Sequence, residues 1–213
     1  MTNKERYLKN IRVISILTRL DRRTRINELL AAHELEYQFS DAITDAETPV
    51  ISCAKSHYKT LKEFYESATA DDKYLLILED DCEFVENLEE KFNKLNIADV
   101  SDWDSLRLGC LHVKRPTPIS DGLWQATFPL DTHCVLYKVS EIPKYLKIIG
   151  DCITNRGILD VYISHQIDKL NILAAYPNLA YQKSGVSDIA NLNYSNYHEN
   201  GTQKIFLDAV LDI

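Results

Sequence analysis

Hydrophobic residues along the chain form two recurring patterns, short apolar runs and stripes with helical spacing. The run 74–78 (YLLIL) is apolar at every position, which is typical of a central strand covered on both faces. In the stretch 50–68, apolar residues recur at alternating spacings of three and four, which predicts a long amphipathic helix. The other predicted strands are 11–17, 36–39, 105–108 and 134–139, and the other predicted helices are 26–34, 87–96, 159–170, 204–213 and one that starts at Glu141.

Strands and helices therefore alternate along most of the sequence. This order predicts an α/β fold with a mostly parallel central sheet and helices on both faces. A length of 213 residues fits one medium domain, and we expect a single domain over 1–213. Two polar stretches, 116–131 and 184–202, are predicted as long irregular loops, and loops of that length tend to carry function.

Charge and composition narrow the classes of function. Acidic residues outnumber basic ones by 32 to 24, and the formal net charge is -8. Such a chain repels a phosphate backbone, so we expect no nucleic-acid partner. A nucleotide ligand stays compatible with this charge, because a divalent cation can mask the local negative charge.

The sequence also suggests where the protein works. We find no apolar run long enough to span a bilayer, and the first ten residues lack the apolar segment of a signal peptide. We therefore expect a cytoplasmic protein without a membrane span. The five cysteines are scattered without a C-x-x-C pair, which favours reduced, mostly buried thiols over disulfides or a zinc site.

Three consecutive acids, Glu79, Asp80 and Asp81, directly follow the apolar run 74–78. In open α/β sheets, ligands bind at the carboxyl ends of the strands. If the extended conformation continues, Glu79 and Asp81 point to the same side. Two carboxylates in this position can hold Mg²⁺ or Mn²⁺, which prefer oxygen ligands and can bridge the phosphates of a nucleotide diphosphate. This is the logic of a DxD motif.

Other interpretations share these three acids. A solvated acidic turn is common after any strand. A receiver-like or adaptor module would use the turn for regulation, although its strand order fits this chain poorly. A nucleotidyltransferase would need the same sheet, carboxylates and metal, but the N-terminal region lacks a glycine-rich phosphate loop.

An ordered set of segments gives a sharper hypothesis. They are VISILTRLDRRTRI (13–26), YQFSDAITD (37–45), ISCAKSHYKTL (51–61), LLILEDDCEF (75–84) and WDSLRLG (103–109), with weaker ones at 132–140, 158–167 and 176–189. Together they resemble glycosyltransferase family 25, which contains lipopolysaccharide-biosynthesis and procollagen galactosyltransferases. Two positions depart from that pattern, since Asp45, at the end of Ala42-Ile43-Thr44-Asp45, and Asp131 stand where the family has glycine.

The resemblance implies a GT-A fold and a metal-dependent transfer of a sugar from a nucleotide-diphosphate sugar. A UDP-sugar is the favoured donor, a glycan or glycoprotein hydroxyl the acceptor, Mn²⁺ or Mg²⁺ the cofactor, and inversion the expected outcome. The nucleotide would bind to about residues 1–110 and the acceptor to about 111–213. The compact length would suit a member from a large DNA virus or a bacterium.

The resemblance also implies which residues bind the donor. The end of the first strand should face the base and ribose, and arginines that follow it should pair with the diphosphate. His57 and Ser56 would bind substrate or support the site, whereas Arg22 and Arg25 are expected in a solvated basic loop. The full donor-binding set is Ser15, Thr18, Arg19, Arg23, Asp41, Ala42, Ser56, His57 and Asp80.

Catalysis and acceptor binding involve later residues. Inverting transfer needs a base near the acceptor hydroxyl, and Asp160 is the first candidate and Asp131 the second. His198, in an H-x-x-G-x-x-K string, is a candidate third metal ligand besides Glu79 and Asp81. Trp124, in the polar stretch 116–131, could stack against an acceptor sugar, whereas Trp103 is expected in the core.

Overall fold

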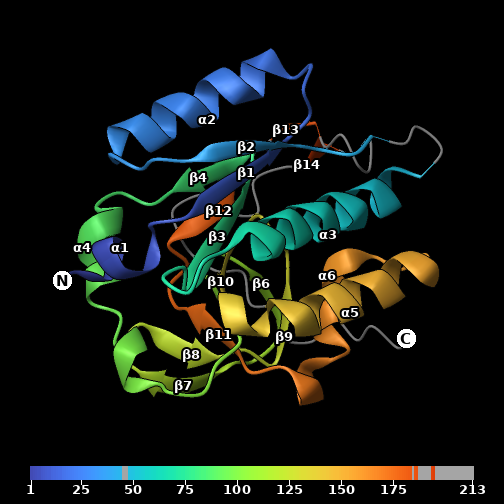
Figure 1. Ribbon diagram of the computed structural model, residues 1–213. Helices are drawn as coiled ribbons and strands as arrows, with labels where there is room; N and C mark the ends of the chain where they lie inside the picture. The colour runs from blue at the N-terminus through green and yellow to red at the C-terminus, as the bar shows by residue number, and fades with distance from the viewer. Residues whose placement is uncertain (45–47, 184, 187–192, 195–213) are drawn as a thin grey trace.

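An eight-stranded sheet forms the centre of the protein (Figure 1). The computed structural model describes residues 1–44, 48–183, 185–186 and 193–194. Strands β10 and β8 run antiparallel to both of their neighbours, and the other six strands share one direction, which confirms the mostly parallel α/β fold. In sheet order, the strands are β2 (Gln38–Asp41), β1 (Ile11–Ser15), β3 (Tyr74–Glu79), β10 (Cys134–Lys138), β5 (Ser105–Arg107), β11 (Ile172–Ala175), β8 (Leu123–Gln125) and β7 (Thr117–Ser120).

Helices cover both faces of this sheet (Figure 1). Residues Leu76 and Leu78 of β3 join the hydrophobic cluster on one face, and Leu75 and Ile77 join the cluster on the other. This alternation explains why β3 is apolar at successive positions. One face carries α1 (Asn3–Tyr7), α2 (Leu20–Ala32) and α4 (Leu88–Asn93), and the other carries α3 (Pro49–Ser67), α5 (Ile142–Thr154) and α6 (Leu159–Ser164).

Smaller elements complete the described chain. The strand β4 follows the acidic turn and pairs with β12, so the turn is held between β3 and a second, two-stranded sheet. Short pairs and 3-10 turns make up the rest. They are β4 (Cys82–Phe84) with β12 (Ala180–Gln182), β6 (Leu111–Lys114) with β9 (Phe128–Leu130), β13 (Gly185–Val186) with β14 (Asn193–Tyr194), and the 3-10 turns Ile97–Asp99, Val139–Glu141 and Ile167–Lys169.

Local sequence signals set several of the element ends. Thr2 caps α1 in a capping box with Glu5, which satisfies backbone donors at the helix start. Both α3 and α5 carry proline in the first turn, where its missing N–H costs no helical hydrogen bond. The apolar stripe predicted over 50–68 is therefore confirmed almost to the residue by α3.

Three predicted boundaries are wrong. Helix α2 begins at Leu20 instead of residue 26, so the expected basic loop is the first turns of a helix. The stretch 116–131 contains β7, β8 and β9 instead of one irregular loop, because β7 pairs with β8, β8 also pairs with β11, and β9 pairs with β6. The stripe over 159–170 is interrupted after Ser164 and continues as a 3-10 turn. The tail helix predicted over 204–213 lies outside the described residues.

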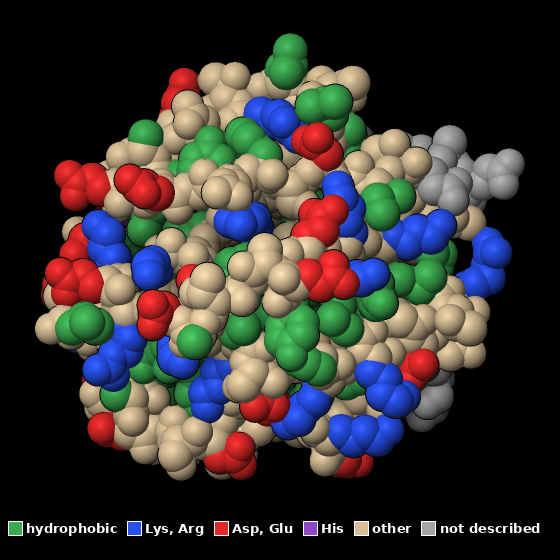
Figure 2. All heavy atoms as spheres, in the orientation of Figure 1, with side chains coloured by type: hydrophobic (Ala, Val, Ile, Leu, Met, Phe, Trp, Pro, Cys, Tyr) green, Lys and Arg blue, Asp and Glu red, His purple; other side chains and the backbone are tan. Residues whose placement is uncertain are grey.

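Individual side chains agree with the expected core. Trp103 is buried and stacks on Tyr74 with a centroid separation of 5.8 Å. All five cysteines are free thiols, and four of them are buried, whereas Cys53 is partly exposed. No helix among the described residues combines the length and the apolar character needed to cross a bilayer. Basic and acidic side chains are interspersed over the face seen in Figure 2.

Candidate functional site

The acidic turn that follows β3 places each of its three carboxylates in a different environment. Asp80 is buried and points toward β1 and α2. The Ser15 hydroxyl donates to Asp80 Oδ2 at 2.7 Å, and Arg22 Nη1 donates to Asp80 Oδ1 at 2.9 Å. Both carboxylate oxygens of Asp80 are thus occupied by protein groups. This residue ties the ends of β3, β1 and α2 together.

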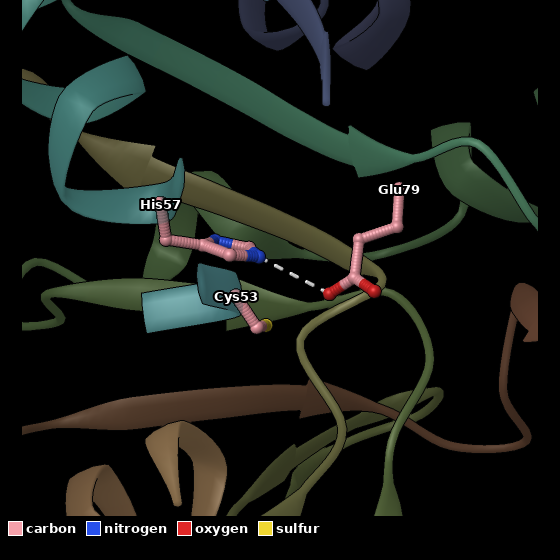
Figure 3. A group of neighbouring side chains, drawn as sticks. All are labelled: Cys53, His57 and Glu79. Carbon is pink, nitrogen blue, oxygen red and sulfur yellow. Dashed lines mark hydrogen bonds and ion pairs between the residues drawn. The ribbon is translucent and has the colours of Figure 1, made fainter. Parts of the chain in front are cut away.

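Glu79 points to the opposite face of the sheet, toward α3 (Figure 3). Its Oε1 lies 3.1 Å from His57 Nε2 and accepts a 2.8 Å hydrogen bond from the Thr132 hydroxyl. Burial alone would raise the pKa of Glu79, but the hydrogen bonds from His57 and Thr132 and the nearby charge of His57 lower it overall. Glu79 is therefore held as a carboxylate anion.

Asp81 has few partners. Its Oδ1 is buried without a hydrogen-bond partner among the described residues, and its Oδ2 lies 3.7 Å from Arg22 Nη1. Burial and the negative charge of Glu79 raise the pKa of Asp81, while Arg22 lowers it only in part. The negative charge of Glu79 acts on Asp81, and the pKa values of the two carboxylates are shifted in opposite directions.

These two carboxylates fit a divalent cation. A buried carboxylate oxygen without a partner is costly, and a bound cation would satisfy it. The donors that Glu79 and Asp81 offer are carboxylate oxygens, which Mg²⁺ and Mn²⁺ prefer. A cation held there would also relieve the repulsion between the two acids.

A second pair of acids, Asp131 and Asp160, lies on the same side of the sheet. The Asp131 backbone N–H donates to Asp160 Oδ2 at 2.9 Å, and the Val161 N–H donates to Asp160 Oδ1 at 2.8 Å. Burial, together with the charges of Asp160 and Glu79, raises the pKa of Asp131 to about 7. A carboxylate that titrates near neutrality is suited to accept a proton.

The backbone conformation at Asp131 is one that glycine favours. Its backbone φ is 69°, in the left-handed region that glycine adopts most readily. Aspartate is among the residues that tolerate this conformation better than most. Asp131 therefore forms a turn that glycine would also form, and its side chain adds a carboxylate there.

Sequence reasoning missed two residues at this site. Arg107 in β5 is fully buried, and its Nη1 donates to the Asp131 carbonyl oxygen at 3.1 Å. Its charge also lowers the pKa of Asp131, against the effect of burial. Cys53 lies one helical turn before His57 and reaches the same point (Figure 3). The spacing of four could have revealed Cys53, whereas no sequence signal distinguishes Arg107 from other arginines.

Several predicted donor-binding residues meet where β1 and β2 end. The Ala42 N–H donates to the Ser15 carbonyl at 2.9 Å. Arg23 donates to the same carbonyl at 3.2 Å and pairs with Asp41, and its guanidinium lies 4.4 Å from the Phe39 ring centroid. The structure thus brings together Ser15, Arg23, Asp41 and Ala42, beside the carboxyl end of β3.

The remaining donor-binding candidates differ in their surroundings. Ser56 in α3 accepts a hydrogen bond from the Ile43 N–H at 2.9 Å, so it fastens the segment that follows β2. Thr18 is exposed, and Arg19 forms a two-point ion pair with Asp21, with both N···O distances at 3.0 Å. Their proposed contacts with a nucleotide stay predictions.

The expectation that Arg22 and Arg25 are solvated is wrong. Arg22 pairs with Asp80, and Arg25 pairs with Glu83 and donates to the Asp80 carbonyl oxygen. Because α2 begins earlier than predicted, both arginines project from one helix toward the acidic turn. They neutralise that side of the turn.

Two predicted residues lie away from this cluster or outside the described chain. Trp124 is in β8, which is separated from β3 by β10, β5 and β11 in the sheet. Its ring packs against Tyr176 with a centroid separation of 4.6 Å. His198, the third predicted metal ligand, lies outside the described residues.

Comparison with known proteins supports the fold. The chain is similar to a glycosyltransferase involved in glycosylation of the major capsid of PBCV-1, with 11% identity, a TM-score of 0.50 and coverage of 84% of this chain and 93% of that one. This likeness, with the sheet described above, confirms the GT-A fold. No protein-family model matches the chain, and no curated protein matches it.

Weaker structural likenesses extend to two classes of enzyme. A Drosophila β1,4-galactosyltransferase 7 in complex with manganese, UDP-galactose and xylobiose matches with 8% identity, a TM-score of 0.41 and coverage of 83% of this chain and 71% of that one. The CTP:phosphocholine cytidylyltransferase of Streptococcus pneumoniae matches with 11% identity, a TM-score of 0.41 and coverage of 85% and 76%.

Proposed function

We propose that the chain is a metal-dependent glycosyltransferase that moves a sugar from a nucleotide-diphosphate sugar, preferably a UDP-sugar, to a hydroxyl of a glycan or glycoprotein. The observation that carries this proposal is the buried Oδ1 of Asp81, which has no hydrogen-bond partner among the described residues and lies just after the strand that ends at Glu79. The GT-A fold and the resemblance to glycosyltransferase family 25 support it. The cytoplasmic location stays a prediction.

The metal would be held by Glu79 and Asp81. Bound there, Mn²⁺ or Mg²⁺ would neutralise the negative charge that builds on the diphosphate leaving group. His57 and Thr132 hydrogen-bond Glu79 and so fix the orientation of its carboxylate. Asp80 orients the same turn from the other side through Ser15 and Arg22.

The nucleotide would lie over the ends of β1 and β2. Ser15, Asp41 and Ala42 would border the base and ribose there. Arg23, already held between Asp41 and the Ser15 carbonyl, would turn its remaining donors toward the diphosphate. Arg19 would join it by exchanging its exposed ion pair with Asp21 for a phosphate contact.

The proton of the acceptor hydroxyl would pass to Asp131. Its pKa of about 7 suits a general base at neutral pH. Asp160 would act as a positioning residue, because it accepts the Asp131 backbone N–H and holds that turn in place. Direct attack by the hydroxyl on the anomeric carbon would invert its configuration. Trp124, beside Tyr176, would offer an aromatic surface to a more distant part of the acceptor.

The proposal is tested with purified protein, a panel of nucleotide-diphosphate sugars, and Mn²⁺ or a chelator. One donor should raise the melting temperature only when Mn²⁺ is present, since a ligand that binds the native state stabilises it by mass action. Asp81→Asn should abolish this rise and lower the rate of nucleoside-diphosphate release by about a hundredfold or more. The matched control is Asp71→Asn, at an exposed position, which should behave like the wild type.

Absence of any metal-dependent rise, in folded protein, would contradict the proposal. An equal rise in Asp81→Asn and wild type would contradict the assigned metal ligands.

A further inference from the structure

Three side chains of different chemistry meet beneath the acidic turn. Cys53 and His57 project from the same side of α3, and Glu79 reaches them from the end of β3 (Figure 3). One ligand atom of each residue, a sulfur, a ring nitrogen and a carboxylate oxygen, lies within 4.8 Å of the other two. His57 is almost fully buried, and the side chain of Glu79 is 17% exposed.

This donor set differs from that of Glu79 and Asp81. Thiolate and imidazole favour zinc, whereas Mn²⁺ and Mg²⁺ favour oxygen ligands. Ligands about 2.0–2.3 Å from a tetrahedral zinc ion lie about 3.5 Å apart. The three atoms therefore need movements of about 1 Å to surround a zinc ion, which rotation of the cysteine and glutamate side chains can supply.

The surroundings also favour a cation. Burial, and then the negative charges of Glu79, Asp160 and Asp81, raise the pKa of the Cys53 thiol, so the free thiol keeps its proton, while the same charges attract a cation that could replace it. His57 Nδ1 is buried without a hydrogen-bond partner among the described residues. To bind a metal, Nε2 gives up its proton and its hydrogen bond to Glu79, and the ring keeps one proton on Nδ1, which has no hydrogen bond to lose among the described residues. The Thr132 hydroxyl donates to the same Glu79 oxygen, Oε1, that lies 3.1 Å from His57 Nε2.

We propose that Cys53, His57 and Glu79 form a zinc site that shares Glu79 with the Mn²⁺ or Mg²⁺ site. On binding, the Cys53 thiol releases its proton to solvent, and the resulting thiolate sulfur, His57 Nε2 and a Glu79 oxygen bind the ion, with water in the fourth position. Because both sites use Glu79, zinc excludes the cation that donor binding requires. This second consequence rests on the proposed function, whereas zinc binding itself does not.

The test uses the full chain, freed of metal, without any nucleotide sugar. Titration with Co²⁺, a spectroscopic substitute for zinc, should give one equivalent of a thiolate-to-cobalt absorption band, which Zn²⁺ then removes. Cys53→Ser should lose the band and weaken zinc binding by more than about tenfold. The matched control Cys152→Ser, at a buried cysteine that packs in the same hydrophobic cluster as Cys53, should keep both. Melting curves of each variant establish that it is folded.

Asp81→Asn separates the two proposals. It should keep the cobalt band and zinc affinity while losing the Mn²⁺-dependent binding of a donor. In the wild type, zinc should reverse the stabilisation that Mn²⁺ and a donor produce.

The zinc site is overturned if folded Cys53→Ser keeps the band, if Cys152→Ser loses it, or if the wild type shows none. If the band appears as expected but no donor binds with Mn²⁺, the proposed function fails and the zinc site stands. If donor binding is metal-dependent but indifferent to zinc, the sharing of Glu79 is overturned.

Discussion

The carboxyl end of β3 separates two regions that contain similar numbers of acidic residues. The two regions differ in whether arginines pair with these acids. Toward α2, acids are matched by arginines, with Arg22 on Asp80, Arg25 on Glu83 and Arg23 on Asp41. Toward α3 and α6, like charges oppose one another, since Glu79 acts on both Asp81 and Asp131, and Asp160 acts on Asp131. The buried Arg107 offsets this effect only in part, at Asp131. Both regions contain several acidic residues, but only the region toward α2 has its negative charge neutralised by arginines.

The two regions also differ in how the oxygens of a buried carboxylate are hydrogen-bonded. Asp80 has both oxygens hydrogen-bonded, so its charge stabilises the fold. Asp81, the next residue, has a buried oxygen without a partner among the described residues and a raised pKa. A region whose buried carboxylates are unfavourable in the metal-free protein is suited to bind a cation, because the cation supplies the missing positive charge. The region with arginine–carboxylate pairs supports this binding region structurally.

The largest expected effect is on the paired side. Asp80→Ala should lower the free energy of unfolding by about 2–4 kcal/mol, because it removes the charged acceptor of both the Arg22 guanidinium and the buried Ser15 hydroxyl. Urea denaturation in the presence of a chelator measures this loss. Asp81→Asn is the matched control, and it should leave stability unchanged or raise it, since it removes a carboxylate that is disfavoured by burial. Equal losses of unfolding free energy in both variants would contradict the view that only the region toward α2 stabilises the fold through its carboxylates.

A smaller effect should appear with pH on the unpaired side. The pKa of Asp131 is raised to about 7 from its ordinary value of 3.8, so the native state holds this proton more tightly than the unfolded chain. The associated stability is present below about pH 4 and is lost as pH rises to about 7. Relative to Asp131→Asn, the metal-free wild type should lose about 2 kcal/mol across this window, after allowance for partial solvation.

Urea denaturation of both proteins at several pH values measures this difference. The Asn variant serves as the reference because acid effects from Glu79 and other groups are common to both proteins. A difference that stays constant from pH 4 to pH 7 would show that Asp131 is not perturbed.

The smallest effect is expected for a pair that is exposed. Lys94 and Glu90 are bonded at 2.6 Å on the surface of the α4 region, and both side chains are more than half exposed. Lys94→Ala should change the free energy of unfolding by less than about 0.5 kcal/mol, since water screens such pairs. Compared with Asp80→Ala, this result would show that burial, and not pairing alone, gives the α2 region its stability. A loss above about 1.5 kcal/mol would contradict that conclusion.

Much of the fold was predictable from local patterns. The apolar run of β3, the stripe of α3 and the proline near the start of α5 each gave an element close to its observed bounds. The start of α2 was not predictable in the same way, because its first turns are basic and have no apolar stripe. Their helical form is supported by ion pairs to Asp80 and Glu83, which lie about sixty residues further along the chain.

The sequence by itself determined the α/β order of elements, the acidic turn after a buried strand, and the helical stripe that forms α3. Only the tertiary structure decided which acids are neutralised. Glu79, Asp80 and Asp81 are adjacent and chemically alike, yet β3 sends Glu79 toward α3 and the turn sends Asp80 toward α2. The environment of each carboxylate depends on helices that are distant in sequence, and for this reason local patterns could not assign it.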